Sequence, residues 1–411
     1  MNVLSDLLVP GDRVFVSGGM GEPAGLLALM QNFPLPVDLE FIQFPIGGVN
    51  ATDLSRLSET ARLTTCFMTP ALMGSATDRV DFLPAQMRWF FEHVSRNTDV
   101  ALIQVAEDQQ GQLRLGLGVD FVPAALSSAR TVIAELNKDF VACAGCPPVD
   151  RRRIDLLIET RSPLPLLKAP SVDEVSRRIG ANVAALVNDG DCIQTGIGAI
   201  PSAVLAALQE KNDLGLHSGL VDDGCMELIR RGNITGSRKC IDAGLHVAGA
   251  VLGSGDLVSW LARAPSVVFR GSDYTHELKI LSRLHNFVSI NSAVEIDLLG
   301  QINAEFSEGR QISGTGGSVD FMRGARASQG GRSIVAMPAT ARKGAVSRIV
   351  PRVGMVTALR TDVDIVVTEY GFAHLGDLPV RARAKALIEI AAPAFREELS
   401  EAAATAFAVF G

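Results

Sequence analysis

The chain lacks the long apolar runs that mark a membrane protein. Apolar residues make up 47% of its 411 residues, yet they fall in short runs, none of which is long enough to span a bilayer. Basic residues are also scarce, because 38 Lys and Arg stand against 45 Asp and Glu, and no Lys/Arg cluster overrides the net charge of −7. We therefore expect no membrane and no nucleic acid among its partners.

The sequence also lacks the pattern of a secretory leader and of a zinc site. No basic region followed by an apolar core opens the chain, so we expect no signal peptide. Cys143 and Cys146 form a lone Cys-x-x-Cys without a second ligand pair, and Pro147 and Pro148 follow where a thioredoxin-like motif would open a helix. We read them as two thiols in a surface loop, expect no metal, and expect a cytoplasmic location.

Apolar runs with strand character alternate with helical segments along the chain. Strands are predicted at 13–17, 100–105 and 131–136, and such runs separated by helices indicate a parallel sheet covered on both faces. Because the chain is long enough for two domains, we predict a C-terminal α/β domain after the N-terminal one.

The connection between the domains is predicted where the composition changes. Between residues 143 and 171 the chain becomes rich in Pro and Arg, which marks a linker. We place the N-terminal α/β domain at 1–170 and the C-terminal α/β domain at 171–411. Ser171 with Glu174 has the spacing of a capping box, which predicts a helix from there to about residue 187.

The turn Gly196-Ile197-Gly198 is the motif around which the second half is organised. It follows an apolar run and precedes a helical stretch with Pro201 in its first turn, where the missing N–H is tolerated. The glycines allow a tight bend and close approach of a ligand, and the N–H groups opening the helix can hold an anion or an oxygen dipole. A strand-to-helix turn without a ligand is the alternative reading.

The same pattern occurs once in each half of the chain. Residues 17–31 align without gaps on residues 195–209, with Pro23 opposite Pro201. This echo predicts two α/β domains of related topology, and a helix over 22–31 with Pro23 in its first turn. Chance similarity of two strand–turn–helix units is the alternative.

Five separated stretches resemble the acetyl-CoA hydrolase/CoA-transferase family. They read GIGAIP (196–201), SINSAVEID followed by GQIN (289–303), GRQISGTGGSVDF (309–321), SRIVP (347–351) and TDVDIVVTEYG (361–371). The resemblance implies two open α/β domains of CoA-transferase type, with the acyl-CoA site in an interdomain cleft. The N-terminal domain would serve the carboxylate and acyl side, and the C-terminal domain the CoA side.

The family reaction depends on a glutamate that this chain does not have. In the family a Glu attacks the acyl-CoA thioester, and CoA passes through a glutamyl–CoA thioester to a second carboxylic acid. The resemblance places this nucleophile at Gly219, and glycine has no group that could form an anhydride. It implies coenzyme A as a co-substrate with no tightly bound cofactor, and a small carboxylate or another acceptor. We expect a homodimer or a higher homo-oligomer.

The resemblance also carries roles to individual positions. Coenzyme A contacts are expected at Gly196, Ile197, Gly198, Ala199, Ile200, Gly314 and Lys343. The backbone of Gly316 and Gly317 is expected to hold the thioester oxygen, and Glu22 and Gly219 are expected in the substrate pocket. Asp222 stands where the family usually has Ser, and His276 where it usually has Asn. An imidazole can act as a general base where an amide cannot, so we predict His276 as the base.

Each candidate has a purely structural alternative. His276 can be a surface-loop histidine, Asp222 a turn residue, Glu22 a helix-start acid favoured by the dipole, and Lys343 a solvated lysine. Three functions stay open: a repurposed acyl-CoA enzyme acting at the thioester, a CoA-transferase using another carboxylate, and a catalytically silent acyl-CoA-binding subunit or sensor.

Overall fold

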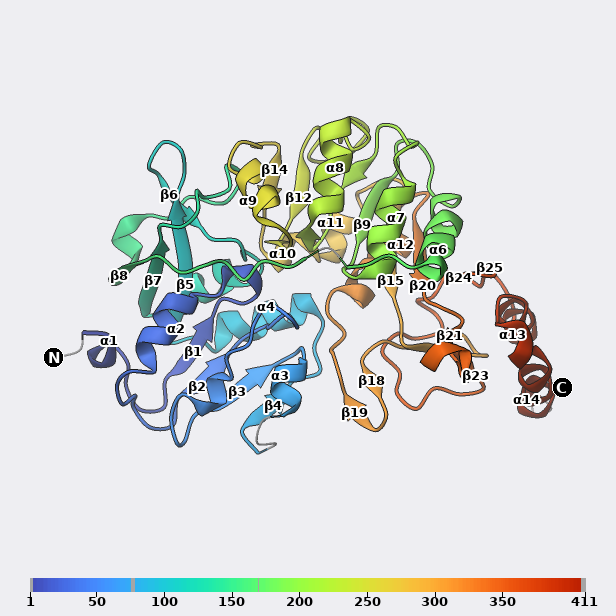
Figure 1. Cartoon of the computed structure of the whole chain (residues 1–411), viewed down its shortest axis with the longest axis horizontal. Coiled ribbons are helices and arrows are strands. Elements are labelled where there is room, and N and C mark those ends of the chain that lie inside the picture. Colours follow the sequence, from blue (N-terminus) through green and yellow to red (C-terminus); the bar gives the residue numbers. More distant parts are fainter. Residues whose placement is uncertain (1–2, 75–77, 169, 408–411) are drawn as a thin grey trace. The chain divides into compact units, whose positions relative to one another are not determined.

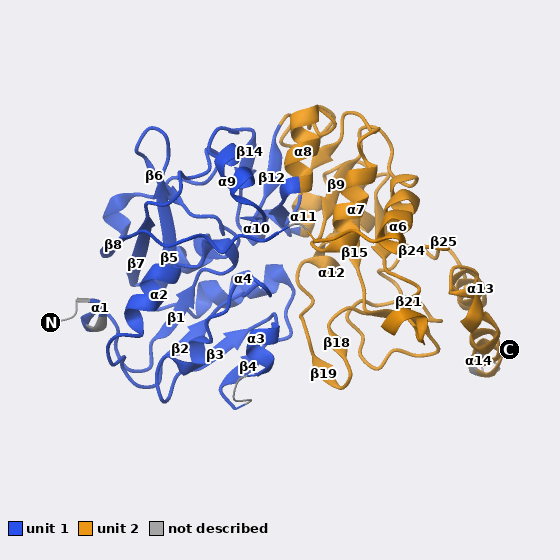
Figure 2. Cartoon of the chain, viewed as in Figure 1, with its two compact units in different colours: residues 1–168, 218–223, 245–277 blue, residues 169–217, 224–244, 278–411 orange. Residues whose placement is uncertain are grey.

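The computed structural model describes residues 3–74, 78–168 and 170–407 (Figure 1). The chain forms two compact units, which Figure 2 colours separately. Unit 1 consists of Met1–Lys168, Ser218–Asp223 and Leu245–Glu277, and unit 2 consists of Ala169–His217, Gly224–Gly244 and Leu278–Gly411. Each unit contains a mainly parallel sheet with helices, which confirms the predicted α/β class.

Unit 1 is built on an eight-stranded sheet with the order β4-β3-β2-β1-β5-β7-β8, and β6 pairs with β5. The strands are β1 (Arg13–Val16), β2 (Glu40–Ile42), β3 (Arg62–Thr65), β4 (Val80–Phe82), β5 (Val100–Glu107), β6 (Leu113–Leu115), β7 (Thr131–Asn137) and β8 (Leu156–Thr160). Its helices are α1 (Val3–Asp6), α2 (Ala24–Met30), α3 (Pro70–Met73), α4 (Met87–Arg96), α5 (Val122–Ser128), α9 (Gly255–Leu261) and α10 (Ser272–Thr275).

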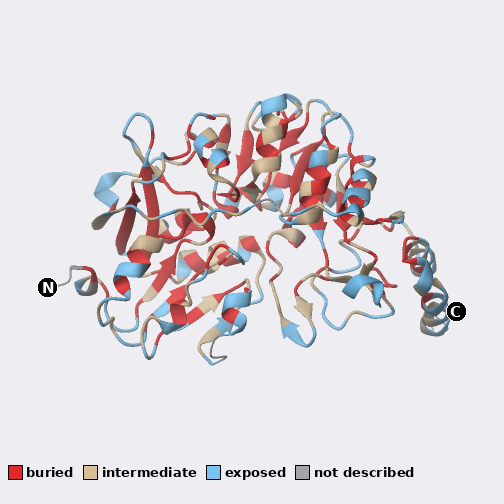
Figure 3. Ribbon diagram, viewed as in Figure 1, coloured by how far each residue is buried: buried red, intermediate tan, exposed pale blue. Residues whose placement is uncertain are grey.

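The central strands of this sheet are buried on both faces. Every residue of β7 and all residues of β5 except the last are buried (Figure 3). Near-continuous apolar runs of this kind are what a parallel sheet covered on both sides requires. The strands predicted at 13–17, 100–105 and 131–136 are confirmed as β1, β5 and β7.

Two short parallel pairs complete unit 1 with residues from later in the chain. β11 (Leu220–Val221) pairs with β13 (Ala250–Val251), and β12 (His246–Ala248) pairs with β14 (Val267–Phe269). They are tied to earlier residues, since Val251 N donates to Leu117 O over 2.8 Å and Val119 N donates to Gly249 O over 3.0 Å. The units therefore divide between Lys168 and Ala169, close to the predicted linker, but unit 1 also takes in two segments from beyond residue 170.

Unit 2 is built on a six-stranded sheet with the order β10-β9-β15-β20-β24-β25, in which β25 alone is antiparallel. The strands are β9 (Cys192–Thr195), β10 (Gly215–Leu216), β15 (Phe287–Ser292), β20 (Arg332–Ala336), β24 (Ile365–Thr368) and β25 (Gly371–His374). The helices assigned here are α6 (Glu174–Ala184), α7 (Ala199–Ala207), α8 (Asp223–Arg231), α11 (Leu278–Leu281), α12 (Ser318–Ala327), α13 (Val380–Glu389) and α14 (Arg396–Phe407).

Short strands lie outside that sheet. β17 (Ile302–Asn303), β16 (Glu295–Asp297) and β23 (Ile349–Val350) form one sheet, while β18 (Phe306–Ser307) pairs with β19 (Arg310–Gln311) and β21 (Thr340–Ala341) with β22 (Val346–Ser347).

Three local expectations are corrected by the structure. α2 begins at Ala24 rather than residue 22, because a 3₁₀ turn over Gly19–Gly21 comes first and Pro23 is the N-cap. α6 is capped by Asp173, whose carboxylate accepts from Ser176 N over 2.8 Å, so Ser171 is not the cap. Cys143 and Cys146 are buried rather than on a surface loop, and burial raises the pKa of the Cys146 thiol.

Candidate active site

The strand order of unit 1 reverses at β1. The strands β2, β3 and β4 follow β1 on one side, whereas β5 lies on the other (Figure 1). In open α/β sheets, ligands bind beyond the carboxyl ends of the strands at such a reversal. The turn that follows β1 contains Gly18, Gly19 and Gly21, so the first copy of the repeated motif lies at this position.

Glycines are required in this turn because other segments lie against it. A Cβ on Gly18 would lie 1.9 Å from Phe44 O, and a Cβ on Gly21 would lie 2.5 Å from Gly118 N. Asn50 fixes the turn, since its Oδ1 accepts from Gly19 N over 2.8 Å and its Nδ2 donates to Gly19 O over 3.0 Å. The Gly19 N–H is thus held by the protein itself.

Glu22, expected in the substrate pocket, follows this turn and is buried. Its Oε2 accepts from Gln43 Nε2 over 2.8 Å, and its carbonyl accepts from Gln104 Nε2 over 3.1 Å. Burial raises the pKa of Glu22 to about 7, despite hydrogen bonds from Gln43 and Asn50 that favour the ionised form. Glu22 therefore titrates near neutral pH.

A second carboxyl, that of the half-buried Asp120, belongs to the same region and was not singled out from the sequence. Its Oδ1 is buried without a hydrogen-bond partner among the described residues, and burial alone raises the pKa of Asp120 to about 8. A Cβ on Gly249 would lie 1.9 Å from this oxygen. The position of Asp120 after an apolar stretch with Gly116 and Gly118 was the only signal in the sequence.

A small cavity connects Asp120 with the glycine turn. Its volume is about 20 Å³. The residues that line it are Phe15, Ser17, Gly18, Gly19, Phe44, Ile46, Gly118, Asp120, Phe121, Val122 and Ala250. Asp120 is the one titratable group in this lining, so the cavity presents a single carboxyl among backbone and apolar groups.

The segment with Gly219, where the resemblance places the nucleophile, lies in unit 1 as well. Gly219 O accepts from Gly249 N over 3.1 Å and from Ala250 N over 3.0 Å. A Cβ on Gly249 would lie 2.8 Å from Gly219 O and 1.9 Å from Asp120 Oδ1, so those two oxygens are close neighbours. Asp222, the other acid predicted here, is half-buried and directly precedes α8.

His276 is buried, which contradicts the surface-loop alternative. It forms the C-cap of α10, and its Nδ1 lies 2.8 Å from Thr275 Oγ1. Burial lowers the pKa of the imidazole to about 3, so the ring is neutral at physiological pH. A ring with so low a pKa has little affinity for a proton, which weakens the argument for His276 as the base.

The strand order of unit 2 reverses at β9, where the second copy of the motif begins. β10 lies on one side of β9 and β15 on the other. The turn that follows β9 opens α7 with Gly198 as N-cap at φ +110°, a conformation that only glycine adopts readily. Ile197 is exposed, and Ala199 and Ile200 form the first turn of α7, with half-buried side chains.

The other positions expected to contact coenzyme A also belong to unit 2. Gly314 and Gly316 lie in the loop before α12, with Gly316 at φ +51°, and Gly317 is the N-cap of that helix. Lys343 is exposed on a 3₁₀ turn and has a positive φ of +58°. The structure therefore divides the predicted positions between the units, with Glu22, Gly219, Asp222 and His276 in unit 1 and the rest in unit 2.

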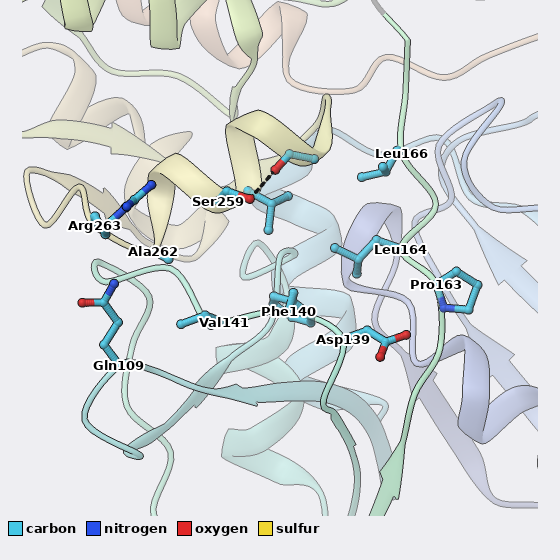
Figure 4. A pocket seen from close by; sticks show the side chains of 12 residues that line it. Gln109, Asp139, Phe140, Val141, Pro163, Leu164, Leu166, Ser259, Ala262 and Arg263 are labelled. Carbon is cyan, nitrogen blue, oxygen red and sulfur yellow. Dashed lines mark hydrogen bonds between the residues drawn. The ribbon is translucent and has the colours of Figure 1, made fainter.

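A larger groove in unit 1 contains none of the predicted positions. It has a volume of about 650 Å³ and is formed by residues before and after β8 together with α9 (Figure 4). Its lining residues are Gln109, Asp139, Phe140, Val141, Pro163, Leu164, Leu166, Gly255, Val258, Ser259, Ala262 and Arg263. Neither buried carboxyl faces it, so size alone does not identify the candidate site.

Among the described residues, no cluster of three or more His, Cys, Asp or Glu side chains is arranged to hold a metal ion. In the same part of the chain, no helix combines the length and the apolar character needed to cross a membrane.

Comparison with known proteins identifies the family. The family descriptions "Acetyl-CoA hydrolase/transferase N-terminal domain" and "C-terminal domain" match residues 80–150 and 253–403. The 4-hydroxybutyrate coenzyme A transferase of Clostridium kluyveri is 39% identical over 396 residues, covering 94% of this chain and 92% of that protein. The chain belongs to the acetyl-CoA hydrolase/transferase family. The family predicted from the sequence motifs is confirmed.

Solved structures of this family have the same fold. RipA from Yersinia pestis superposes with a TM-score of 0.88 at 32% identity, covering 97% of this chain and 95% of that one. A 4-hydroxybutyrate CoA-transferase from Porphyromonas gingivalis gives a TM-score of 0.79 at 31% identity, covering 98% and 96%. The chain is thus a CoA-transferase/acyl-CoA hydrolase-like enzyme, and coenzyme A is a substrate of its family.

Proposed function

We propose that the chain acts at the thioester of a small acyl-CoA by a route that does not pass through a glutamyl–CoA thioester at residue 219. The observation that carries this proposal is Gly219 itself, because a family member that keeps the glycine motifs has no carboxylate where the family resemblance puts the nucleophile. Water or another acceptor then attacks the thioester carbonyl directly, or a proton is removed from the neighbouring carbon.

Unit 2 supplies the proposed coenzyme A contacts. Gly196, Gly198 and Gly314 leave the backbone open to the thioester end, and Lys343 offers a cation to the phosphates. The N–H groups at the start of α12, next to Gly316 and Gly317, are suited to stabilise an oxyanion. Unit 1 binds the acyl group and the acceptor in this proposal, and Glu22 in that unit titrates near neutral pH.

A transferase that uses a different carboxylate is the second candidate. Glu22 and Asp120 favour it, because each is a carboxyl whose pKa is raised into the working range of an enzyme by burial. A silent acyl-CoA-binding subunit is the third candidate, and the absence of a nucleophile at Gly219 is the observation behind it.

Turnover assays separate the three candidates. Purified protein is incubated with acetyl-CoA, butyryl-CoA and 4-hydroxybutyryl-CoA, with and without acetate, while free CoA and acyl products are followed. CoA release without acetate supports direct attack by water. New acyl-CoA formed only with acetate supports the transferase. Binding of the acyl-CoAs without any product supports the silent subunit and overturns the proposed function.

A further inference from the structure

Asp120 is a half-buried residue whose Oδ1 is buried and has no hydrogen-bond partner among the described residues. A structural acid in the interior is held by donors, as Asp297 is by the backbone N–H groups of Leu299 and Gln301. Asp120 Oδ1 instead has no donor within hydrogen-bonding distance among the described residues. Leaving a buried acceptor unsatisfied destabilises a protein, so such a group calls for an explanation.

Backbone hydrogen bonds to neighbouring segments fix the main chain of Asp120. Asp120 N donates to Gly249 O over 3.3 Å, and Asp120 O accepts from Ser272 N over 2.7 Å. Only a glycine fits at residue 249 while the carboxyl keeps its place, since a Cβ there would lie 1.9 Å from Oδ1. The backbone on both sides of the residue is therefore fixed while its Oδ1 is left unpaired.

The cavity next to Asp120 suits one small molecule. Its volume of about 20 Å³ exceeds the roughly 10–15 Å³ that one water needs and is too small for an acyl group. The lining contributes polar groups from Ser17 and from the backbone of Gly18 and Gly118, to which a water can hydrogen-bond. Asp120, which lines this cavity, also lies close to Gly219, since a Cβ on Gly249 would lie 1.9 Å from Asp120 Oδ1 and 2.8 Å from Gly219 O.

The charged and titratable groups around Asp120 are few. On α10, whose Ser272 N donates to the Asp120 carbonyl, Asp273 is exposed with a pKa raised by desolvation, and His276 is neutral. On the turn after β1 the nearest such group is Glu22, and none of these side chains is among the causes that shift Asp120. Burial is the one cause, so the carboxyl exchanges its proton near neutral pH without a charged partner.

We propose that Asp120 is the general base that activates a water molecule in the cavity for attack on the acyl-CoA thioester. This inference rests on the proposed function and names the group that performs its chemistry. The missing side chain at Gly219 leaves room for the thioester to meet the water instead of a glutamate.

Asp120 alone accepts and returns the one proton that this reaction moves. As the water oxygen bonds to the thioester carbonyl carbon, Asp120 Oδ1 takes a proton from the water. The tetrahedral oxyanion then collapses, the C–S bond breaks, and its electron pair goes to sulfur. The CoA thiolate takes the proton back from Asp120, which restores the carboxylate, and the products are a carboxylic acid and free CoA.

The pH profile of the wild-type enzyme is the first test, since it needs no variant. A base must be deprotonated, so the rate of CoA release from acetyl-CoA and butyryl-CoA should rise with pH and level off above about 8. Asp120→Asn keeps the shape of the side chain and should lower this rate roughly 10²–10⁴-fold. The residual activity of the variant should no longer increase with pH. Asp81→Asn, which removes the exposed ion pair between Arg62 of β3 and Asp81 of β4, should change neither rate nor profile.

Four outcomes would overturn the inference. One is an unchanged rate in Asp120→Asn, and another is a rise that disappears in Glu22→Gln but stays in Asp120→Asn. The third is a hydroxamate at residue 120 after hydroxylamine is added during turnover, because it would make Asp120 a covalent nucleophile. CoA release that requires acetate also overturns it while leaving thioester chemistry intact, whereas a wild type without any turnover contradicts the proposed function itself.

Discussion

Gln43 Nε2 donates a hydrogen bond to Glu22 Oε2 over 2.8 Å, and both side chains are buried in unit 1. A neutral amide satisfies one oxygen of the carboxyl but brings no positive charge. Burial therefore dominates and raises the pKa of Glu22 to about 7, from an ordinary value of 4.5. The protein carries a carboxyl that loses its proton close to physiological pH.

Replacing Glu22 by Gln should change how stability depends on pH. The folded state holds the Glu22 proton more tightly than the unfolded state. The contribution of this proton to the free energy of unfolding is therefore complete below about pH 4.5 and is lost as pH rises through 7. The loss amounts to roughly 3 kcal/mol. In urea unfolding at several pH values, the free energy of unfolding of Glu22→Gln should increase relative to that of the wild type between pH 5 and 8. Parallel stability curves for the two proteins would contradict this.

Introducing the family nucleophile should create a trappable intermediate. Gly219 is not among the described glycines with a positive φ, so a glutamate can adopt its backbone conformation. After treatment with acetyl-CoA and borohydride, mass spectrometry should find the 219 segment modified in Gly219→Glu and unmodified in the wild type. A modified Asp222 or another acid in the wild type would favour the transferase candidate.

Gly317→Leu should block coenzyme A without unfolding unit 2. Gly317 lies at φ −88° and ψ 0°, which other residues adopt, so the backbone tolerates the change. A leucine side chain at the N-cap of α12 would nevertheless stand where the thioester is proposed to approach. Isothermal titration with CoA should show binding weakened at least tenfold. Gly354→Leu, at an exposed loop glycine with open space around it, is the matched control and should bind like the wild type.

His276→Asn should leave the pH profile of CoA release between pH 5 and 9 unchanged. The pKa of this buried ring is lowered to about 3, so its protonation does not alter in that range. The variant should lose thermal stability instead, because the contact of Nδ1 with Thr275 Oγ1 is disturbed. A rise in rate with pH that vanishes in His276→Asn would restore the histidine as the base and count against Asp120.

The repeated motif was readable from the sequence because its signals are local. Gly196, Gly198 and Pro201 mark a turn and a helix start within six residues, and the structure places α7 as predicted. In the first copy the same reasoning placed the helix start too early, since contacts of Gly18 and Gly21 with distant segments set the 3₁₀ turn before α2. Local signals located the element, and tertiary packing fixed its boundary.

The properties of single acids and bases were less accessible from the sequence. Asp120 becomes notable only because Gly249, more than a hundred residues later, packs against its carboxyl. His276 was predicted as the general base, but nothing adjacent in the sequence indicates that its ring is buried. A pKa is set by desolvation and by partners across the fold, so it follows from packing that one sequence does not display.

The interleaving of the two units has a consequence for synthesis on the ribosome. Chains fold from the N-terminus as they emerge, yet unit 1 needs Leu245–Glu277, so its two short strand pairs and the surroundings of Asp120 stay incomplete until residue 277 of 411 has been made. A fragment ending near residue 170 would lack Gly219, Gly249 and α10. Neither unit can be expressed as one continuous piece, and a nascent chain stalled before residue 277 would expose apolar surface that chaperones recognise.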